Sequence, residues 1–268
     1  MIPELNSIGS ILAELKISAQ GQTDVGRIRS ANQDSFLIDH PQQLYIVADG
    51  MGGHAGGEIA SKLAIEEVQK FIGTNQDIFS SNDDPDDPKI CQELARGVNH
   101  ASAKIYERAL EDPSLKGMGT TATLVKFIGH RAYCAHVGDS RLYLIRTGFL
   151  YQITFDHSLV NEQVRAGVIT PEEAEIHRLK NVITRSVGYQ EEEDVDTTSF
   201  DVYDNDILLL CSDGLHGKVN DRELSNLAKE RQLDAVDDMI AMANERGGED
   251  NITAILIKIT KTDSNDTK

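Results

Sequence analysis

Four short apolar segments of this sequence each adjoin an aspartate that stands next to a glycine or a polar turn residue. The four aspartates are Asp49, Asp139, Asp213 and Asp250. Strand ends project their side chains from a rigid scaffold, so carboxylates in such places can converge from distant parts of a chain. A single Asp-Gly pair is an ordinary turn sequence and identifies no site by itself. Four aspartates at the ends of apolar segments indicate a fold that brings these ends together.

The segments around these aspartates carry the patterns of strands joined by tight turns and of amphipathic helices. Apolar, β-forming runs predict strands at 44–49, 119–127, 131–137, 141–146, 206–213 and 251–260, and breaks at 129–130 and 138–140 fit hairpin turns. Helical spacing predicts helices at 57–72, 90–110, 157–167, 171–177, 221–229 and 234–245. The acidic, proline-containing stretch 74–88 suits a mobile connector. Hairpin strands mixed with helix pairs favour an α+β fold of antiparallel sheets over a doubly wound parallel sheet.

The composition excludes several classes of function. The chain has 268 residues, of which 40% are hydrophobic, so we expect one domain over 1–260 followed by a flexible tail at 261–268. Its 44 acidic and 26 basic residues give a net charge of -18, which should repel nucleic acids and anionic membranes. Its three cysteines are widely spaced, and no run of about eighteen apolar residues occurs. We therefore expect a cytoplasmic protein with reduced thiols.

The clustered acids predict a site for divalent cations. Aspartates brought together in a low-dielectric cleft repel one another unless cations or protons are present. Oxygen ligands without histidine or cysteine favour Mg²⁺ or Mn²⁺ over zinc. Two such ions about 3.5 to 4 Å apart can activate a shared water for attack on phosphorus, without a covalent enzyme intermediate. Arg29, in the stretch GRIRSANQD, has a planar side chain suited to bidentate contact with phosphate.

Eight stretches of the sequence follow one another in a diagnostic order. They are VGRIRSANQDS, ADGMGGHAGGEIAS, MGTTATL and HVGDSRLYLIR, then TFDHSLV, NVITRSVG, LLLCSDGL and GGEDNITAILI. This ordered set resembles the type 2C, or PPM, family of metal-dependent protein phosphatases in its bacterial form, over residues 17–259. Each stretch alone is weak, whereas the ordered set is highly specific. The resemblance implies a four-layer α-β-β-α sandwich, two antiparallel sheets flanked by helix pairs, with the metal site at one end.

The resemblance also implies metal-binding roles for individual residues. Asp49 would bridge two metal ions, and Gly50 would give its backbone carbonyl to the second of them. Asp213 and Asp250 would complete the ligands of the first ion. Asp139 would hold a third, weaker ion together with Asp213.

Other positions match or depart from the family pattern. Arg29 matches the phosphate-binding arginine, and Asp34 matches an acid that orients metal-bound water. Gln33 replaces the glutamate of many members, which predicts altered metal affinity but not inactivity. Met51 stands where eukaryotic relatives carry a histidine proposed as general acid. His54, three residues further along, is the candidate proton donor; a loop-packing role and protonation by water are the alternatives.

These features predict a Ser/Thr phosphoprotein phosphatase that opposes a Ser/Thr kinase in signalling and acts as a monomer on phosphorylated proteins. The segment 158–182 takes the place of the family's flap, where it would either border the substrate cleft or serve packing only. One alternative is a pseudophosphatase that sequesters a phosphoprotein, which the complete set of aspartates disfavours. Another is a two-metal hydrolase of small phosphorylated metabolites, for which GMGGHAGG provides no phosphate loop ending in Lys-Ser/Thr.

Overall fold

The computed structural model describes residues 15–53, 55–80 and 88–262, whose strands form two antiparallel sheets. The first sheet has the order β1-β11-β10-β7-β8, and the second has the order β2-β3-β5-β6-β9, with β4 paired to β3. The first contains β1 (Leu15–Asp24), β7 (Arg141–Arg146), β8 (Phe149–Gln152), β10 (Ile207–Cys211) and β11 (Ile252–Lys261). The second contains β2 (Asp34–Asp39), β3 (Leu44–Met51), β4 (Gly119–Thr120), β5 (Ala122–Ile128), β6 (Arg131–Val137) and β9 (Asp196–Asp201).

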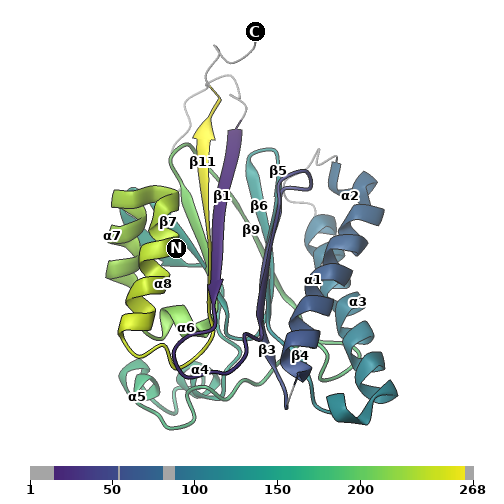
Figure 1. Cartoon of the computed structure of the whole chain (residues 1–268). Coiled ribbons are helices and arrows are strands. Elements are labelled where there is room, and N and C mark those ends of the chain that lie inside the picture. The colour runs from purple at the N-terminus through teal and green to yellow at the C-terminus, as the bar shows by residue number, and fades with distance from the viewer. Residues whose placement is uncertain (1–14, 54, 81–87, 263–268) are drawn as a thin grey trace.

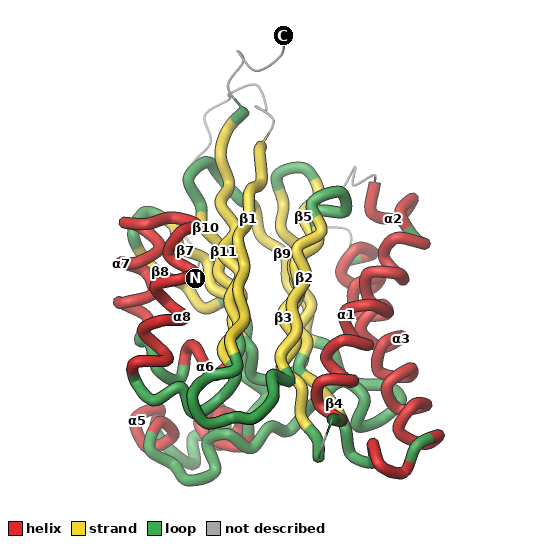
Figure 2. Tube along the Cα trace, in the orientation of Figure 1, coloured by secondary structure: helices red, strands yellow, loops and turns green. Residues whose placement is uncertain are grey.

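A pair of helices covers the outer face of each sheet, as Figures 1 and 2 show. The first sheet is covered by α7 (Asp221–Arg231) and α8 (Ala235–Glu245), and the second by α1 (Gly56–Thr74) and α3 (Lys89–Glu111). The described residues also form four short α-helices: α2 (Gln76–Ser80), α4 (Leu159–Arg165), α5 (Pro171–Glu175) and α6 (Asp213–His216). The predicted α-β-β-α sandwich of antiparallel sheets and helix pairs is therefore confirmed.

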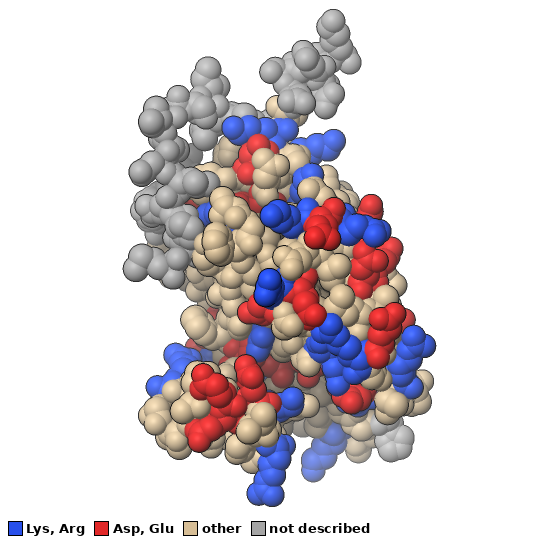
Figure 3. All heavy atoms as spheres, turned by 90° about the vertical axis from the view of Figure 1, so that its left-hand side faces the viewer, with Lys and Arg blue, Asp and Glu red and all other residues tan. Residues whose placement is uncertain are grey.

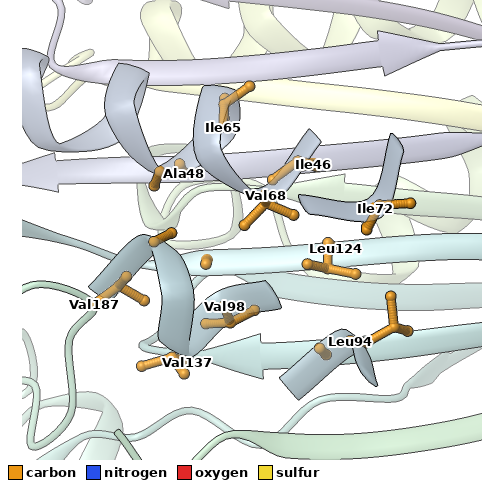
Figure 4. Packing of buried hydrophobic residues seen from close by; sticks show 14 of the residues in the cluster. Ile46, Ala48, Ile65, Val68, Ile72, Leu94, Val98, Leu124, Val137 and Val187 are labelled. Carbon is orange, nitrogen blue, oxygen red and sulfur yellow. The ribbon is translucent and has the colours of Figure 1, made fainter. Parts of the chain in front are cut away.

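The apolar run of β3 illustrates how the sequence builds these layers. Successive side chains of a strand point to opposite faces of its sheet. Leu44, Ile46 and Ala48 belong to the core beneath α1 and α3, whereas Tyr45 and Val47 belong to the core between the two sheets. Figure 4 shows the first of these cores, with side chains from α1 and α3 facing those of the strands. A strand buried on both faces reads as a continuous hydrophobic run, which is why β3 could be predicted.

The structure departs from the predicted elements in several places. The strand expected at 119–127 is broken at Thr121, whose backbone N–H and side-chain hydroxyl both bind the backbone of Asp49. The strand expected at 206–213 ends at Cys211, and Asp213 begins α6. Part of the expected connector is helix α2, because Ile78 and Phe79 pack against the core of α1 and α3. Lys261, the first residue of the expected tail, belongs to β11, and 263–268 lie outside the described residues.

The surface over α7 and α8 mixes acidic and basic side chains, as Figure 3 shows. Interspersed charges of both signs are typical of a solvated face. Among the described residues, no helix is both long enough and apolar enough to span a membrane.

A buried ion pair joins β7 to the residue that precedes β10. The Arg146 guanidinium donates to both carboxylate oxygens of Asp206, at 2.9 and 2.6 Å, and the two side chains are 3% and 2% exposed. Arg146 also lies over the Tyr203 ring, with its Cζ atom 4.6 Å from the ring centroid. Removing one partner of such a pair leaves the other charge buried without compensation.

We expect Asp206→Ala to lower the free energy of unfolding by about 3 to 5 kcal/mol, because Arg146 would keep its buried charge. Urea unfolding followed by circular dichroism measures this loss. Asp201→Ala is the matched control, since Asp201 pairs with Arg131 and is 54% exposed. That exposed pair should contribute less than about 1 kcal/mol. Equal losses in the two variants would contradict the expectation.

Candidate active site

Five aspartates from separate parts of the chain converge at one end of the sandwich. Asp34 begins β2 and lies directly opposite Asp49 near the end of β3, in register across the antiparallel pair. Asp139 follows β6, Asp213 begins α6 after β10, and Asp250 precedes β11. The loop that connects β1 to β2 and the helix α6 mark this end of the molecule in Figure 1. Strand ends thus bring together the acids that sequence analysis singled out.

The pKa values show that these carboxyl groups interact. Burial raises the pKa of Asp34 to about 6, helped by the charges of Asp213 and Asp250. Burial and the charge of Asp213 raise the pKa of Asp139 to about 8. The pKa of Asp49 is raised well above its usual value by burial and by the other four aspartates. A cluster of acids whose charged forms are disfavoured is a place where protons or cations bind.

Asp213 completes the cluster. Burial and the charge of Asp250 raise the pKa of Asp213 to about 6, although a hydrogen bond from Asp49 and the charge of Arg29 act in the opposite direction. A hydrogen bond between two carboxyl groups requires a proton on one of them. A shared proton therefore holds these two side chains together.

Asp34 connects the two sheets through hydrogen bonds of its side chain. Asp34 belongs to β2 of the second sheet. Its Oδ2 atom accepts hydrogen bonds from the hydroxyls of Ser212 (2.8 Å), which directly follows β10, and Thr253 (2.6 Å) of β11 in the first sheet. Its Oδ1 atom is buried without a hydrogen-bond partner among the described residues, as is Oδ1 of Asp213. Buried oxygens left unpaired in this way are free to bind a water or a cation.

The backbone around Asp49 and Gly50 is fixed by close packing. Thr120 donates its hydroxyl to the carbonyl of Asp49 (2.9 Å), while the Thr121 hydroxyl accepts from the Asp49 N–H (2.9 Å). A Cβ atom at Gly50 would lie 2.1 Å from the backbone oxygen of Gly57. Only glycine therefore fits at position 50 without moving the chain.

Arg29 reaches the cluster from the loop between β1 and β2. Its Nη2 atom donates to Oδ2 of Asp250 at 2.7 Å, and its side chain is 51% exposed. The Asn251 amide holds this loop by donating to the carbonyls of Val25 (2.9 Å) and Ala31 (3.0 Å). These contacts place a half-exposed guanidinium at the edge of the aspartate cluster.

The departures from the family pattern lie beside the cluster. The Gln33 backbone N–H donates to the side-chain oxygen of Asn251 (2.8 Å), and its carbonyl accepts from the Ser61 hydroxyl (2.6 Å). Met51 ends β3. His54 lies outside the described residues, so its role stays a prediction.

The polar residues that support the aspartates were not predicted from the sequence. Ser212 and Thr253 bind Asp34, and two histidines, His157 and His216, bind the backbone around Asp139. Ser212 directly precedes Asp213, and Thr253 lies two residues after Asn251. Their closeness to these motifs in the sequence is the signal that could have indicated them. Their contacts depend on how the two sheets meet, which no local pattern specifies.

The donor set fits hard divalent cations. It consists of the carboxylates of the aspartate cluster, and two of their buried oxygens, in Asp34 and Asp213, have no partner among the described residues. No three acidic, histidine or cysteine side chains of the described chain form a ready-made set of metal ligands. The present contacts explain this, since Asp250 pairs with Arg29 and Asp49 with Asp213. Binding of a cation would exchange these contacts for bonds to the ion.

An α-β-β-α sandwich with an aspartate cluster and an arginine at one end is the arrangement of a metal-dependent phosphatase. The model of the protein phosphatase 2C family matches residues 27–257. The chain therefore belongs to this family, as its motifs predicted.

Individual relatives agree with this assignment. Protein phosphatase PhpP of Streptococcus pneumoniae is 36% identical over 248 residues, which cover 90% of this chain and 97% of that protein. The crystal structure of the Mycobacterium tuberculosis serine/threonine phosphatase PstP/Ppp matches with a TM-score of 0.81 and 33% identity, over 92% of this chain and 99% of that one. The PstP catalytic domain in complex with two manganese ions matches with a TM-score of 0.80 and 33% identity, over 92% and 100%.

We expect the metal-free protein to lose stability as the pH rises from about 7 to about 8.5. The folded state holds a proton on Asp139 that the unfolded chain has released, since an unfolded aspartate has a pKa of about 3.9. Raising the pH through the folded pKa therefore favours unfolding. Unfolded histidines, with a pKa of about 6.5, are mostly neutral across this range. Urea unfolding in the presence of a chelator measures the change.

Asp139→Asn is the matched control for this measurement, because an amide cannot ionise. Its stability should fall by about 1 kcal/mol less than that of the unaltered protein over the same pH range. An equal fall in both proteins would show that Asp139 does not hold a proton in the folded state.

Proposed function

We propose that this protein removes phosphate from phosphoserine and phosphothreonine residues of proteins with the help of Mn²⁺ or Mg²⁺. The observation that carries the proposal is the convergence of five aspartates and Arg29 in a chain of the protein phosphatase 2C family. The manganese-containing PstP domain and the relatives named serine/threonine phosphatases support the same activity.

The aspartates hold the cations in this proposal. Asp49, the carbonyl of Gly50, Asp213 and Asp250 hold two core ions, and Asp139 holds a third, weaker ion together with Asp213. The bound ions supply an activated water and neutralise charge on the phosphate. Oxygen ligands alone make Mg²⁺ and Mn²⁺ the suitable ions.

The remaining residues bind the substrate and position water. Arg29 exchanges its contact with Asp250 for two phosphate oxygens, since its guanidinium is half exposed and its planar fork matches them. Asp34, anchored by Ser212 and Thr253, orients water through its unpaired oxygen. His54 donates the proton to the leaving oxygen.

The cellular setting of the activity belongs to the same proposal. A phosphoprotein phosphatase opposes kinases, and we assign this one a Ser/Thr kinase as its counterpart. The protein acts as a monomer in the cytoplasm. Its three cysteines are free, which is typical of that reducing compartment. Residues 1–260 form one catalytic unit, in which the flap at 158–182 borders the substrate cleft.

Asp213→Asn should lower the turnover of a phosphothreonine peptide by more than about a hundredfold, because even indirect partners of a metal ion contribute 10 to 100-fold. The measurement is phosphate release in Mn²⁺ and in Mg²⁺, compared with release from phosphorylated metabolites. Glu249→Gln is the control, since Glu249 neighbours Asp250 and is 67% exposed. Undiminished activity in Asp213→Asn would refute the proposed function, and faster release from metabolites would favour a small-molecule hydrolase.

Arg29→Lys should raise the KM for the same peptide by about tenfold, with a smaller effect on kcat, because lysine keeps the charge and loses the bidentate geometry. Steady-state kinetics at saturating Mn²⁺ separates the two constants. Arg27→Lys, two residues away in the same loop, is the control and should leave KM unchanged. A KM that is unaltered in Arg29→Lys would exclude Arg29 from phosphate binding.

A further inference from the structure

The turn that carries Asp139 has a backbone conformation that depends on contacts with neighbouring parts of the fold. It connects β6 to β7, and Gly138 has a φ of +109°, which side chains other than that of glycine rarely adopt. A Cβ atom at Gly138 would lie 2.5 Å from Cγ2 of Thr121. The turn is therefore packed tightly against Thr121, between β4 and β5, and the direction of the Asp139 side chain depends on what holds the turn from its other sides.

His157 holds the turn on one side. Its backbone N–H donates to the carbonyl of Gly138 (2.7 Å), and its Nδ1 atom accepts from the N–H of Gly138 (3.1 Å). A neutral imidazole that accepts at Nδ1 carries its proton on Nε2. That nitrogen lies 3.2 Å from Oδ2 of Asp196 on β9. With its side chain only 3% exposed, the ring is fixed in one orientation and one tautomer.

The same histidine connects the turn to the end of the flap. The Thr184 N–H donates to the carbonyl of His157 (2.8 Å), and Arg185 donates to Oδ1 of Asp196 (2.9 Å). Arg185 thereby secures the carboxylate that faces His157. Movement of the flap base would be transmitted to the Asp139 turn through this ring.

His216 holds the turn on the other side. It is the last residue of α6, the short helix that Asp213 begins, and its Nε2 atom donates to the carbonyl of Asp139 at 3.0 Å. Burial lowers the pKa of His216 to about 4, so the donor is a neutral imidazole at neutral pH. Residues three apart in a helix lie on one face. One rigid turn of helix therefore carries the Asp213 carboxylate and the hydrogen bond to Asp139.

We propose that His157 and His216 are positioning residues that clamp the Asp139 turn from two sides and so set the distance between the Asp139 and Asp213 carboxylates. The inference rests on the proposed function, in which these two aspartates share the weaker cation. Both histidines act through the backbone of the turn, by their hydrogen bonds to Gly138 and Asp139. The clamp determines how tightly the weaker cation is bound and leaves the two core ions in place.

His216→Leu and His216→Gln test the clamp, because leucine removes the donor and glutamine keeps an N–H at the position of Nε2. Calorimetric titration with Mn²⁺ should show the weaker site about tenfold weaker in His216→Leu, close to its original affinity in His216→Gln, and the tighter sites unchanged in both. Asp139→Ala is the reference that lacks the weaker site. His216→Phe replaces the leucine variant if circular dichroism shows that leucine unfolds the chain.

A second measurement does not depend on the metal or on activity. In the presence of a chelator, the backbone amides of residues 138–140 should exchange hydrogen about tenfold faster in His216→Leu and in His157→Leu, and at the original rate in His216→Gln. Unchanged exchange, or equal effects of leucine and glutamine at position 216, would overturn the clamp. If the unaltered protein binds no Mn²⁺ and hydrolyses no phosphopeptide, the proposed function fails, and the exchange rates still decide whether the clamp exists.

Discussion

The repulsion between buried carboxylates is the constraint on which the rest of this structure depends. Like charges in a low-dielectric site oppose folding unless something compensates them. Here the compensation comes from three sources: protons on groups of raised pKa, the Arg29 guanidinium, and hydroxyl donors such as those that bind Asp34. A scaffold that holds carboxylates together despite their repulsion strongly favours the binding of a divalent cation over occupation of the site by water.

The sandwich supplies this rigidity from both sides. Each sheet is packed between a helix pair and the other sheet, so side chains on both faces of the central strands are buried. Strand ends can then hold aspartates in nearly fixed positions. Hydrogen bonds of Thr120 and Thr121 with the backbone of Asp49 restrict the position of this residue further. The metal-binding end is therefore stabilised by cores that lie far from it along each strand.

The sequence predicted the fold where burial leaves a local pattern. The strands at 131–137 and 141–146 have the predicted bounds because continuous apolar runs end at turns containing glycine. Strands β1, β2, β8 and β9 were missed. Each forms a sheet edge with only one neighbour, and β9 reads as the polar run DTTSFD. The aspartates were found because their motifs are local. The groups that support them, such as Thr253 and His216, were missed because their contacts join different elements of the chain.

The segment 158–182 combines a base that is held in place with an exposed outer part. Its two ends are joined at the base, because the N–H of Leu159 donates to the carbonyl of Val182. His157, directly before the segment, binds this base to the Asp139 turn. Its outer part exposes apolar side chains, with Val168 at 68% and Ile176 at 85%. Substitutions on this outer surface change what the segment contacts without moving the base. The exposed surface of this segment can therefore change while the geometry of the aspartates stays constant, provided that the contacts of the base are kept.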